Sequence, residues 1–411
     1  MTATTIRPLA ASEKGFALDR VYIGYSVRTR GVLDLAAMAV AYDALRQRYP
    51  ALTARIEKTD KGFEFVEARD VLQGMVVSAR SAESGLEDID LDQCAALGLL
   101  SVRQDGDESV VTLFTHHSIT DSATGQDRVE LLWSYYTAAV EGEIGTVESL
   151  PFPCPVEEIL AAHGIHKPPF PEQAAPPAQA ATTDRFDGKA RYVREAARLR
   201  LGAEHTAALT ELSHREQVSI NGLVSGALLL AEAELRGSAV SDLVYMFPVS
   251  LRAHLDPKVS VHEGTVVLGF TGYVASGEVT TIVDLGRAIS AQVRAGLADG
   301  LIQLSPLLIP EGSEGVMPQI PGLVTATNWG RLPQLRVPAG LEILDFHSTL
   351  ASTPATAPTA PDQLPTPPNY IISSFDGRLS IEVDRPGASV EDQQQRLNIL
   401  EKVLRQNIPL L

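Results

Sequence analysis

Two adjacent histidines and a nearby aspartate are the residues of this chain best suited to chemistry. Residues 116–121 read His-His-Ser-Ile-Thr-Asp. A histidine side chain has an ordinary pKa of about 6.5, so it can accept a proton near neutral pH. The aspartate, Asp121, can cap a following helix or hold a cation. This spacing permits general-base catalysis by one of the histidines.

The elements on either side of this segment decide how it is presented. Residues 110–115 form an apolar, β-branched run that predicts a strand, and residues 125–140 have the periodicity of a helix. Neighbouring side chains on a strand point to opposite faces. We therefore expect one of His116 and His117 to face a cleft and the other to point into the protein.

Three other interpretations of the segment compete with base catalysis. An ordinary loop is the simplest, and most adjacent histidine pairs would be explained by it. Two histidines and a carboxylate can also bind zinc or iron, but neighbours on a strand diverge, and the His-Glu-x-x-His spacing of zinc helices is absent. A serine hydrolase would need a Gly-x-Ser-x-Gly elbow, which the sequence lacks. We therefore predict no metal site and no serine nucleophile.

The length of the chain and its proline distribution suggest two lobes. A chain of 411 residues is expected to form two or three units. Residues 151–190 are rich in proline and poor in periodic pattern, which is typical of a linker. We predict an N-terminal lobe over 1–165, a linker over 166–190, and a C-terminal lobe over 191–411 with a crossover segment near 345–370.

Strands and helices alternate in both halves, so the predicted class is α/β or α+β, each lobe a mixed sheet with helices. The expected helices cover residues 33–49, 125–140, 204–216, 223–235, 282–297 and 389–405. The expected strands cover residues 51–56, 110–115, 191–201, 243–248, 264–274, 322–328 and 370–383. Asp34 and Ser219 are expected to cap the helices that follow them.

Composition excludes several function classes. A net charge of −17 argues against non-specific nucleic-acid binding and against a polybasic membrane anchor. Cys94 and Cys154 form no Cys-x-x-Cys motif, so we expect neither a disulfide framework nor a cysteine zinc site. The first twelve residues lack an apolar run, and the most apolar helical segment is too short to span a bilayer. We expect a cytoplasmic protein without a transmembrane segment.

The motif and five other segments together resemble a known superfamily. It includes chloramphenicol acetyltransferase, nonribosomal-peptide condensation domains and plant BAHD acyltransferases, and within it the chain is most similar to the polyketide-associated acyltransferases of actinobacteria. The matching segments are Arg-Gly-Val-Leu-Asp at 30–34, Tyr-Pro-Ala-Leu at 49–52, the motif at 116–121, Ser-Ile-Asn-Gly at 219–222, Phe-Pro-Val-Ser-Leu-Arg at 247–252 and Pro-Ala-Gly-Leu-Glu-Ile at 338–343.

This resemblance implies a fold and a set of roles. The fold would be two chloramphenicol-acetyltransferase-like lobes with an active-site tunnel between them. His117 would be the general base, His116 would support it, and Asp121 would form a structural ion pair with Arg252. No covalent acyl-enzyme is implied.

The resemblance also implies the reaction. The chain would move an acyl group from acyl-CoA or an acyl carrier protein of a polyketide synthase to a hydroxyl of a polyketide or lipid acceptor. No permanently bound cofactor is implied, and we expect a monomer. Acetylation of a macrocyclic natural product and amide formation by a condensation-type enzyme stay open, and a non-catalytic scaffold that binds carrier proteins is a weaker alternative.

Several residues depart from the family pattern or have two interpretations. The family commonly has glycine after the motif aspartate, where this chain has Ser122, and Gly125 is expected to supply the missing backbone freedom. Asn328, Trp329 and Gly330 are expected at the lobe junction, where Trp329 either lines an acyl channel or simply packs. A cationic strip over 189–200 either docks a phosphate-bearing donor or is a solvated strand edge; it comprises Lys189, Arg191, Arg194, Arg198 and Arg200.

Overall fold

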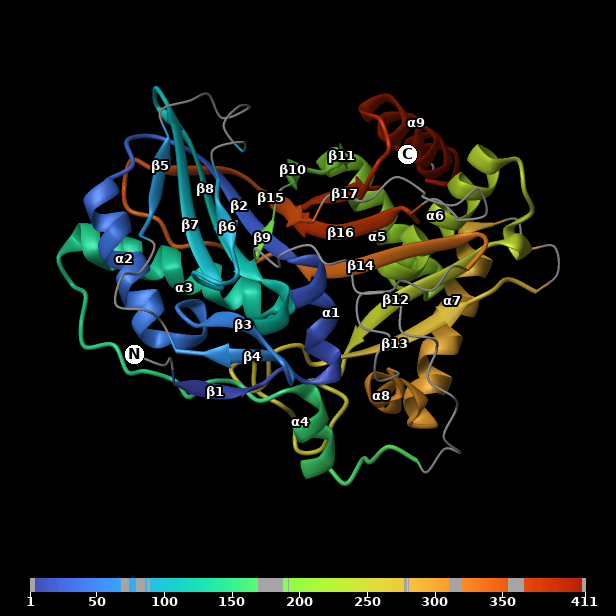
Figure 1. Ribbon diagram of the computed structural model, residues 1–411. Helices are drawn as coiled ribbons and strands as arrows, with labels where there is room; N and C mark the ends of the chain where they lie inside the picture. The colour runs from blue at the N-terminus through green and yellow to red at the C-terminus, as the bar shows by residue number, and fades with distance from the viewer. Residues whose placement is uncertain are drawn as a thin grey trace.

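Two lobes, each built around a six-stranded sheet, make up the fold (Figure 1). The computed structural model describes residues 4–67, 74–78, 86, 89–168, 188–190, 192–276, 279, 281–309, 320–353 and 366–408. The fold class is mixed α/β, with the N-terminal lobe at the left of Figure 1 and the C-terminal lobe at the right.

The sheet of the N-terminal lobe is mostly antiparallel. Its order is β10 (Tyr192–Glu195), β15 (Glu342–Ser352), β2 (Tyr22–Arg30), β8 (Glu108–His116), β7 (Gly98–Asp105) and β5 (Val76–Ser78). Helices α2 (Leu35–Arg48) and α3 (Ser122–Glu141) pack against it and supply much of the apolar core. Smaller elements surround this layer: the sheet of β1 (Thr5–Pro8), β4 (Gly62–Val66) and β3 (Arg55–Thr59), the pair β6 (Leu91–Asp92) and β9 (Lys189–Ala190), and helices α1 (Ala11–Asp19) and α4 (Val156–Ala162).

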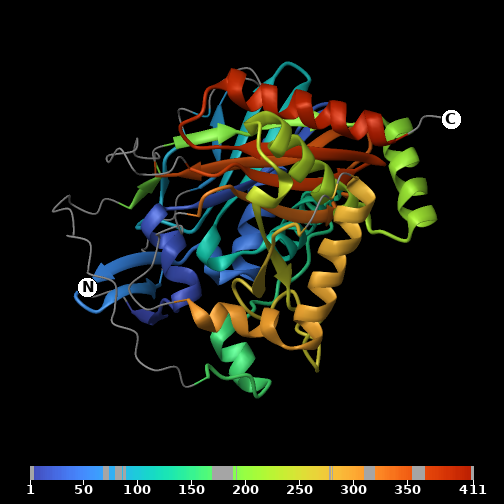
Figure 2. The ribbon, with the colours of Figure 1, turned by 90° about the vertical axis from the view of Figure 1, so that its right-hand side faces the viewer.

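The sheet of the C-terminal lobe mixes parallel and antiparallel pairs. Its order is β11 (Ala197–Arg200), β17 (Arg378–Asp384), β16 (Asn369–Phe375), β14 (Leu323–Arg331), β12 (Val244–Ser250) and β13 (Leu268–Tyr273). Helices lie along one side of this sheet, as Figure 2 shows. They are α5 (Ala203–Glu216), α6 (Ile220–Arg236), α7 (Ile282–Ala298) and α9 (Val390–Asn407), and the short α8 (Leu301–Leu304) follows α7.

Side-chain caps fix where α2, α6, α7 and α9 begin. Asp34 accepts hydrogen bonds from the main chain of Ala36 and Ala37, and Ser219 accepts one from Gly222. Thr281 and Ser389 cap α7 and α9 in the same way. Each cap satisfies main-chain N–H groups that have no partner inside the helix. Both caps predicted from the sequence, Asp34 and Ser219, are confirmed.

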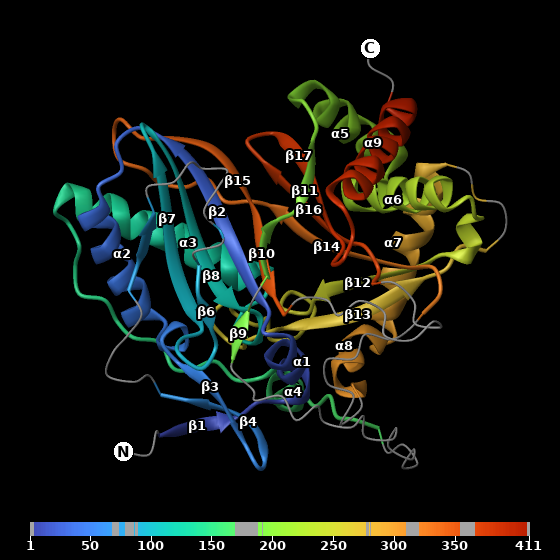
Figure 3. The ribbon, with the colours of Figure 1, turned by 45° about the horizontal axis from the view of Figure 1, so that its top comes forward.

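The two lobes share strands across the predicted linker. Strands β10 and β15 lie beyond residue 190 in the chain, but both belong to the N-terminal sheet, where β15 pairs with β2 and β10 pairs with β15 (Figure 3). Strand β15 overlaps the beginning of the crossover segment expected near 345–370, and residues 354–365 of that segment lie outside the described residues. The division of the chain at residues 165 and 190 stays a prediction, since the sheets interlock across it.

Three predicted strands differ from the structure. Residues 51–56 were expected to be one strand, but a 3-10 turn at Pro50–Leu52 precedes β3. The expected strand over 191–201 is divided between two sheets, as β10 and β11. The expected strand over 370–383 is a hairpin, because Asp376 and Gly377 turn with positive φ values of 47° and 69° between β16 and β17. Apolar residues stand on both sides of each break, so the sequence pattern did not mark where one element ended.

No single helix in the described part of the chain is long and apolar enough to cross a membrane. The pair α5 and α6 meets the length and composition criteria only when the two are joined across a bend of 106°.

Candidate active site

His116 is the last residue of β8 and is completely buried. Its Nδ1 accepts a hydrogen bond from the main-chain N–H of Ser118 at 3.2 Å and lies 2.7 Å from the Ser118 hydroxyl. Its Nε2 is buried without a hydrogen-bond partner. Burial, with a smaller effect of neighbouring His117, lowers the pKa of His116 to about 3. This imidazole is therefore neutral, and its hydrogen bond from Ser118 stabilises the turn that follows β8.

His117 begins the 3-10 turn that follows β8 (His117–Ile119) and is half-buried. Its main-chain N–H donates to the carbonyl of Val21 at 2.7 Å, which fixes the turn to the residue before β2. Burial lowers the pKa of His117, against the opposing effects of nearby carbonyls and Asp121. The two histidines thus differ as divergent neighbours should: one is enclosed, and the other is partly open.

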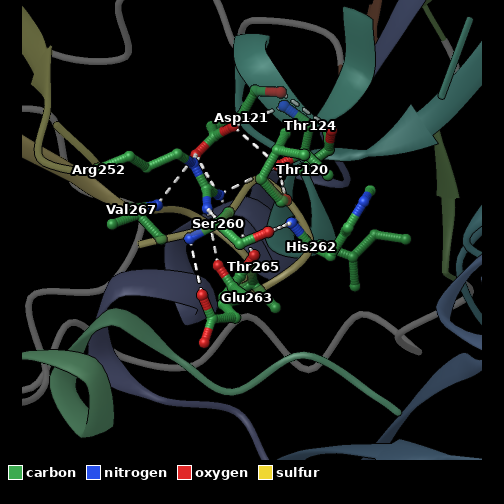
Figure 4. Close-up of polar contacts among 12 residues, drawn as sticks. Thr120, Asp121, Thr124, Arg252, Ser260, His262, Glu263, Thr265 and Val267 are labelled. Atoms are coloured by element: carbon green, nitrogen blue, oxygen red, sulfur yellow. Dashed lines mark hydrogen bonds and ion pairs between the residues drawn. The ribbon is translucent and has the colours of Figure 1, made fainter. Parts of the chain in front are cut away.

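Asp121 binds across the interface of the two lobes (Figure 4). It caps α3 through Oδ1, which accepts from the main chain and the hydroxyl of Thr124, both at 2.9 Å. Its Oδ2 accepts from Arg252 Nη2 at 2.9 Å and from the main-chain N–H of Val267 at 3.1 Å. Although burial raises the pKa of Asp121, Arg252 and these hydrogen bonds lower it overall. The ion pair with Arg252 that the family resemblance implies is present.

Arg252 also organises the loop that lies between β12 and β13. Its Nη1 donates to the carbonyls of Ser260 at 2.5 Å and Glu263 at 2.7 Å, and its Nη2 also donates to the Thr124 hydroxyl at 3.1 Å. Figure 4 shows these contacts converging on one guanidinium. Removing one member of such a buried pair typically costs about 3–5 kcal/mol, because its partner is left uncompensated.

Arg128 is a further buried residue of the motif region that sequence reasoning missed. Its Nη2 donates to the carbonyl of Ile119 at 3.1 Å, inside the motif, while Nε and Nη1 have no hydrogen-bond partner. The ring of Tyr49 lies 5.2 Å from the guanidinium, and the Tyr49 hydroxyl donates to Asp127 at 2.6 Å. The sequence did contain a signal for Arg128. This residue follows the helix cap Asp121 by seven residues, or two helical turns, so it lies on the same side of α3 as the cap.

A small cavity lies beside Arg128 at the lobe interface. Tyr49, Thr124, Arg128 and Gly264 are among its lining residues, and its volume is about 10 Å³. His262 of the C-terminal lobe closes it, with Nδ1 3.2 Å from the Tyr49 hydroxyl. Such a space holds about one water molecule.

Comparison with known proteins identifies the family. The C-terminal region of phthiocerol/phthiodiolone dimycocerosyl transferases matches residues 191–384. A phthiocerol/phthiodiolone dimycocerosyl transferase of Mycobacterium tuberculosis is 33% identical over 412 residues, covering 94% of this chain and 95% of that protein. One from Mycobacterium sp. strain JLS is 34% identical over 84% of this chain and 87% of its own length. This chain belongs to that family.

Solved structures agree with this assignment. Polyketide synthase associated protein 5 from M. tuberculosis superposes with a TM-score of 0.79 at 29% identity, covering 98% of this chain and 100% of its own. A trichothecene 15-O-acetyltransferase from Fusarium sporotrichioides shares the fold, with a TM-score of 0.68 at 10% identity over 97% of this chain and 94% of its own. The protein is therefore an acyltransferase of the polyketide-associated type, with the fold of the condensation and acyltransferase domains.

Trp329 connects the lobes of this acyltransferase by packing. It is buried and stacks on Tyr25 of β2, with ring centroids 4.9 Å apart. Its carbonyl accepts a hydrogen bond from Gln126 of α3 at 2.8 Å. Tyr25 in turn donates to the main-chain carbonyl of Asp121 at 3.2 Å. Of the two roles considered for Trp329, these contacts support packing at the junction.

Asn328 and Gly330 shape the strand around this tryptophan. The register of β14 on β16 shifts between them, so Trp329 is the extra residue of a bulge. Asn328 Oδ1 accepts from the main-chain N–H of Gly330 at 2.8 Å, and Gly330 has a φ of +71°, which favours glycine. Both residues are exposed. The bulge turns Trp329 toward the N-terminal lobe.

Gly125 has a different purpose from the one expected. It lies inside α3, and a Cβ there would lie 1.9 Å from the ring of Tyr25. The glycine therefore provides space for Tyr25 and not backbone freedom. Ser122, where the family prefers glycine, is the half-buried first residue of α3.

The cationic strip consists largely of ion pairs between the two sheets. Arg194 of β10 pairs with Asp384 of β17, and Arg198 of β11 binds Asp345 of β15 through two hydrogen bonds of 2.5 and 2.7 Å. Both arginine side chains are mostly buried, so neither belongs to a solvated strand edge. Lys189 pairs with Asp90 at the surface and Arg200 with Asp345, while Arg191 lies outside the described residues.

Proposed function

We propose that this acyltransferase moves an acyl group from a thioester of coenzyme A or of an acyl carrier protein to a hydroxyl group, with His117 as the general base. The observation that carries this proposal is the position of His117. It is a half-buried imidazole with a lowered pKa, on a turn that is fixed from both lobes. A base that is neutral at working pH can accept a proton.

The geometry of the ring selects the nitrogen that would accept the proton. Nδ1 is buried and has no hydrogen-bond partner, so Nε2 is the nitrogen we assign to the acceptor hydroxyl. As the proton moves to Nε2, the hydroxyl oxygen forms a bond to the thioester carbon. The carbon–sulfur bond then breaks, and the proton passes from Nε2 to the leaving thiolate. These steps account for every proton and bond, and they need no covalent acyl-enzyme.

The nature of the substrates is also part of the proposal. The relatives are named as dimycocerosyl transferases for phthiocerol and phthiodiolone, and one similar structure is associated with a polyketide synthase. We therefore propose a polyketide or lipid alcohol as acceptor, with both substrates meeting in a tunnel between the lobes, which would exclude water. We expect the protein to act as a monomer in the cytoplasm, without a permanently bound cofactor.

Replacement of His117 tests the proposed base. His117→Ala should lower kcat about 10²–10⁴-fold, because that is the usual contribution of a general base. The probe is palmitoyl-CoA with 1-octanol, and the thiol released is followed with a chromogenic reagent. His214→Ala, on the exposed face of α5, is the control and should retain wild-type turnover. A folded His117→Ala protein with wild-type turnover would contradict the assignment.

The acceptor atom can be distinguished with the same variant. An amine is a stronger nucleophile than an alcohol and needs less help from a base. If the protein instead forms amides, 1-octylamine should react faster than 1-octanol, and the loss in His117→Ala should be milder with the amine. A series of acyl-CoA lengths then tests whether long or short acyl groups are preferred.

A further inference from the structure

Among the described residues, no hydrogen bond to Nδ1 fixes the orientation of the His117 imidazole. Catalytic histidines are usually held by a carboxylate or a carbonyl on the second ring nitrogen. Here Nδ1 is buried without a partner. The carbonyls of His117 and Thr120 act on its pKa, but neither completes a hydrogen bond to Nδ1.

Asp121 is not available to hold the ring. Its Oδ1 accepts two hydrogen bonds from Thr124, and its Oδ2 accepts from Arg252 and from the main chain of Val267. Both oxygens are thus directed to the helix cap and to the C-terminal lobe. The orientation of the imidazole must have another source.

Phe16 supplies a flat surface against this imidazole. It lies on α1, which packs on the motif turn. Its ring is parallel to that of His117 within 6°, and the ring centroids are 4.0 Å apart. Rotation of the imidazole out of its present plane would break this parallel contact. Aromatic pairs prefer offset-stacked or edge-to-face arrangements, and such a pair stabilises beyond the effect of its buried area.

We propose that Phe16 is a positioning residue, which holds the ring plane of His117, while the enclosure of Nδ1 leaves Nε2 as the nitrogen that faces the substrates. This inference rests on the proposed role of His117 as base. It also explains how a base without a hydrogen bond to Nδ1 keeps its ring in one plane. Helix α1 thereby affects the reaction only through the contact of Phe16 with the base.

Two substitutions of Phe16 separate orientation from simple apolar cover. Phe16→Leu keeps an apolar side chain of similar reach but removes the flat ring, whereas Phe16→Tyr keeps the ring. We expect kcat with palmitoyl-CoA and 1-octanol to fall about 3- to 10-fold in Phe16→Leu, and to remain within twofold of wild type in Phe16→Tyr. KM for both substrates should change less than twofold in either variant.

Phe152→Leu is the matched control. Phe152 is also half-buried in an aromatic pair, with ring centroids 5.1 Å from Phe65, but its partner ring is a phenylalanine and not the proposed base. Its thermal stability should fall about as much as that of Phe16→Leu, while its kcat stays at the wild-type value.

Each other outcome would overturn the inference. An unchanged kcat in Phe16→Leu would show that the stack does not position the base. A rise in KM at constant kcat would make Phe16 a substrate contact, and equal losses in the Leu and Tyr variants would indicate a structural effect. If His117→Ala itself remains active, the proposed function fails first; if it is inactive and Phe16→Leu is normal, only this inference fails.

Discussion

Two polar clusters join the lobes, and they are built in opposite ways. One surrounds Asp121 and Arg252 beside the motif, and the other surrounds His347 of β15, at the other junction of the two sheets. The first has a single carboxylate with a side chain 1% exposed, and each of its oxygens has hydrogen-bond partners. The second has several carboxylates, and neither ring nitrogen of its histidine has a hydrogen-bond partner among the described residues.

The His347 cluster is held by charge at longer distances. The ring nitrogens lie 3.8 Å from Glu195 Oε1 and 3.7 Å from Asp345 Oδ2, and neither has a hydrogen-bond partner. Burial lowers the pKa of His347, but Asp345 and Glu195 raise it to about 9. Burial raises the pKa of Glu195, but His347 and Arg103 lower it to about 2. Glu382 of the C-terminal sheet accepts from the main chain of Ser348 at 3.1 Å.

The two clusters therefore differ in the pH at which they lose a charge. The pKa of Asp121 is lowered, so its ion pair loses charge only in acid below its ordinary range. The His347 cluster loses a charge as pH rises through about 9. The motif joint therefore keeps one geometry over the whole range in which His117 would act, while the second joint changes with pH.

Substitution of Asp121 should have the largest effect on stability. Asp121→Ala leaves the Arg252 guanidinium buried without its carboxylate, so the free energy of unfolding should fall by about 3–5 kcal/mol. Asp121→Asn keeps an oxygen for the cap and should fold better, although it also loses the charge. Urea denaturation at pH 7 measures both.

Asp34→Ala is the matched control, because Asp34 also caps a helix and, among the described residues, pairs with no arginine. Its cost should be about 1 kcal/mol, the usual value for a helix cap. Equal losses at Asp34 and Asp121 would show that only the cap matters and would remove the distinction between the motif joint and an ordinary helix start. A fully stable but inactive Asp121→Ala protein would point to a chemical role for Asp121 instead.

Local signals in the sequence predicted the local parts of the fold. Asp34 and Ser219 are caps because short polar side chains reach their own helix, and nothing distant is needed. The strand before His116 and the helix after Asp121 were likewise predicted from periodicity. The assignment of β10 and β15 to the N-terminal sheet was not, because strand pairing between residues so far apart leaves no local pattern.

The site was predictable only where the resemblance named its residues. The pairing of Asp121 with Arg252, 131 residues apart, followed from the family pattern. Phe16 could not be found in this way, because a single aromatic residue on a short helix has no motif and acts only through the packing of α1 on the motif turn. The ion pairs of Arg194 and Arg198 were not predicted, since their acidic partners lie on other strands.

Replacement of His347 should have an intermediate effect that depends on pH. The pKa of His347 in the folded state is about 9, above its ordinary value, so its charge stabilises the fold fully below about pH 6.5. This contribution is lost as pH rises through 9. His347→Gln should therefore cost at most about 3 kcal/mol at pH 6 and much less above pH 9.5.

Urea denaturation of wild type and His347→Gln at pH 6, 8 and 9.5 gives the comparison. His214→Gln, an exposed histidine on α5, should show no such difference between these pH values. If the cost of His347→Gln is the same at pH 6 and pH 9.5, the cluster is not held by the charge of His347, and the contrast between the two joints disappears.

Arg198 gives the smallest expected effect and decides whether the cationic strip binds a donor. Arg198→Met removes the two hydrogen bonds to Asp345 from a partly buried pair, so stability should fall by about 1–2 kcal/mol. Arg200→Gln is the control, because Arg200 lies 3.4 Å from the same Asp345 but is more exposed. If Arg198 acts only as a tie between the sheets, KM for palmitoyl-CoA should change less than twofold in both variants. A KM that rises severalfold in Arg198→Met while stability is unchanged would reverse the interpretation. It would make the second joint a docking site for the phosphates of the donor, and the two joints would then differ in function as well as in construction.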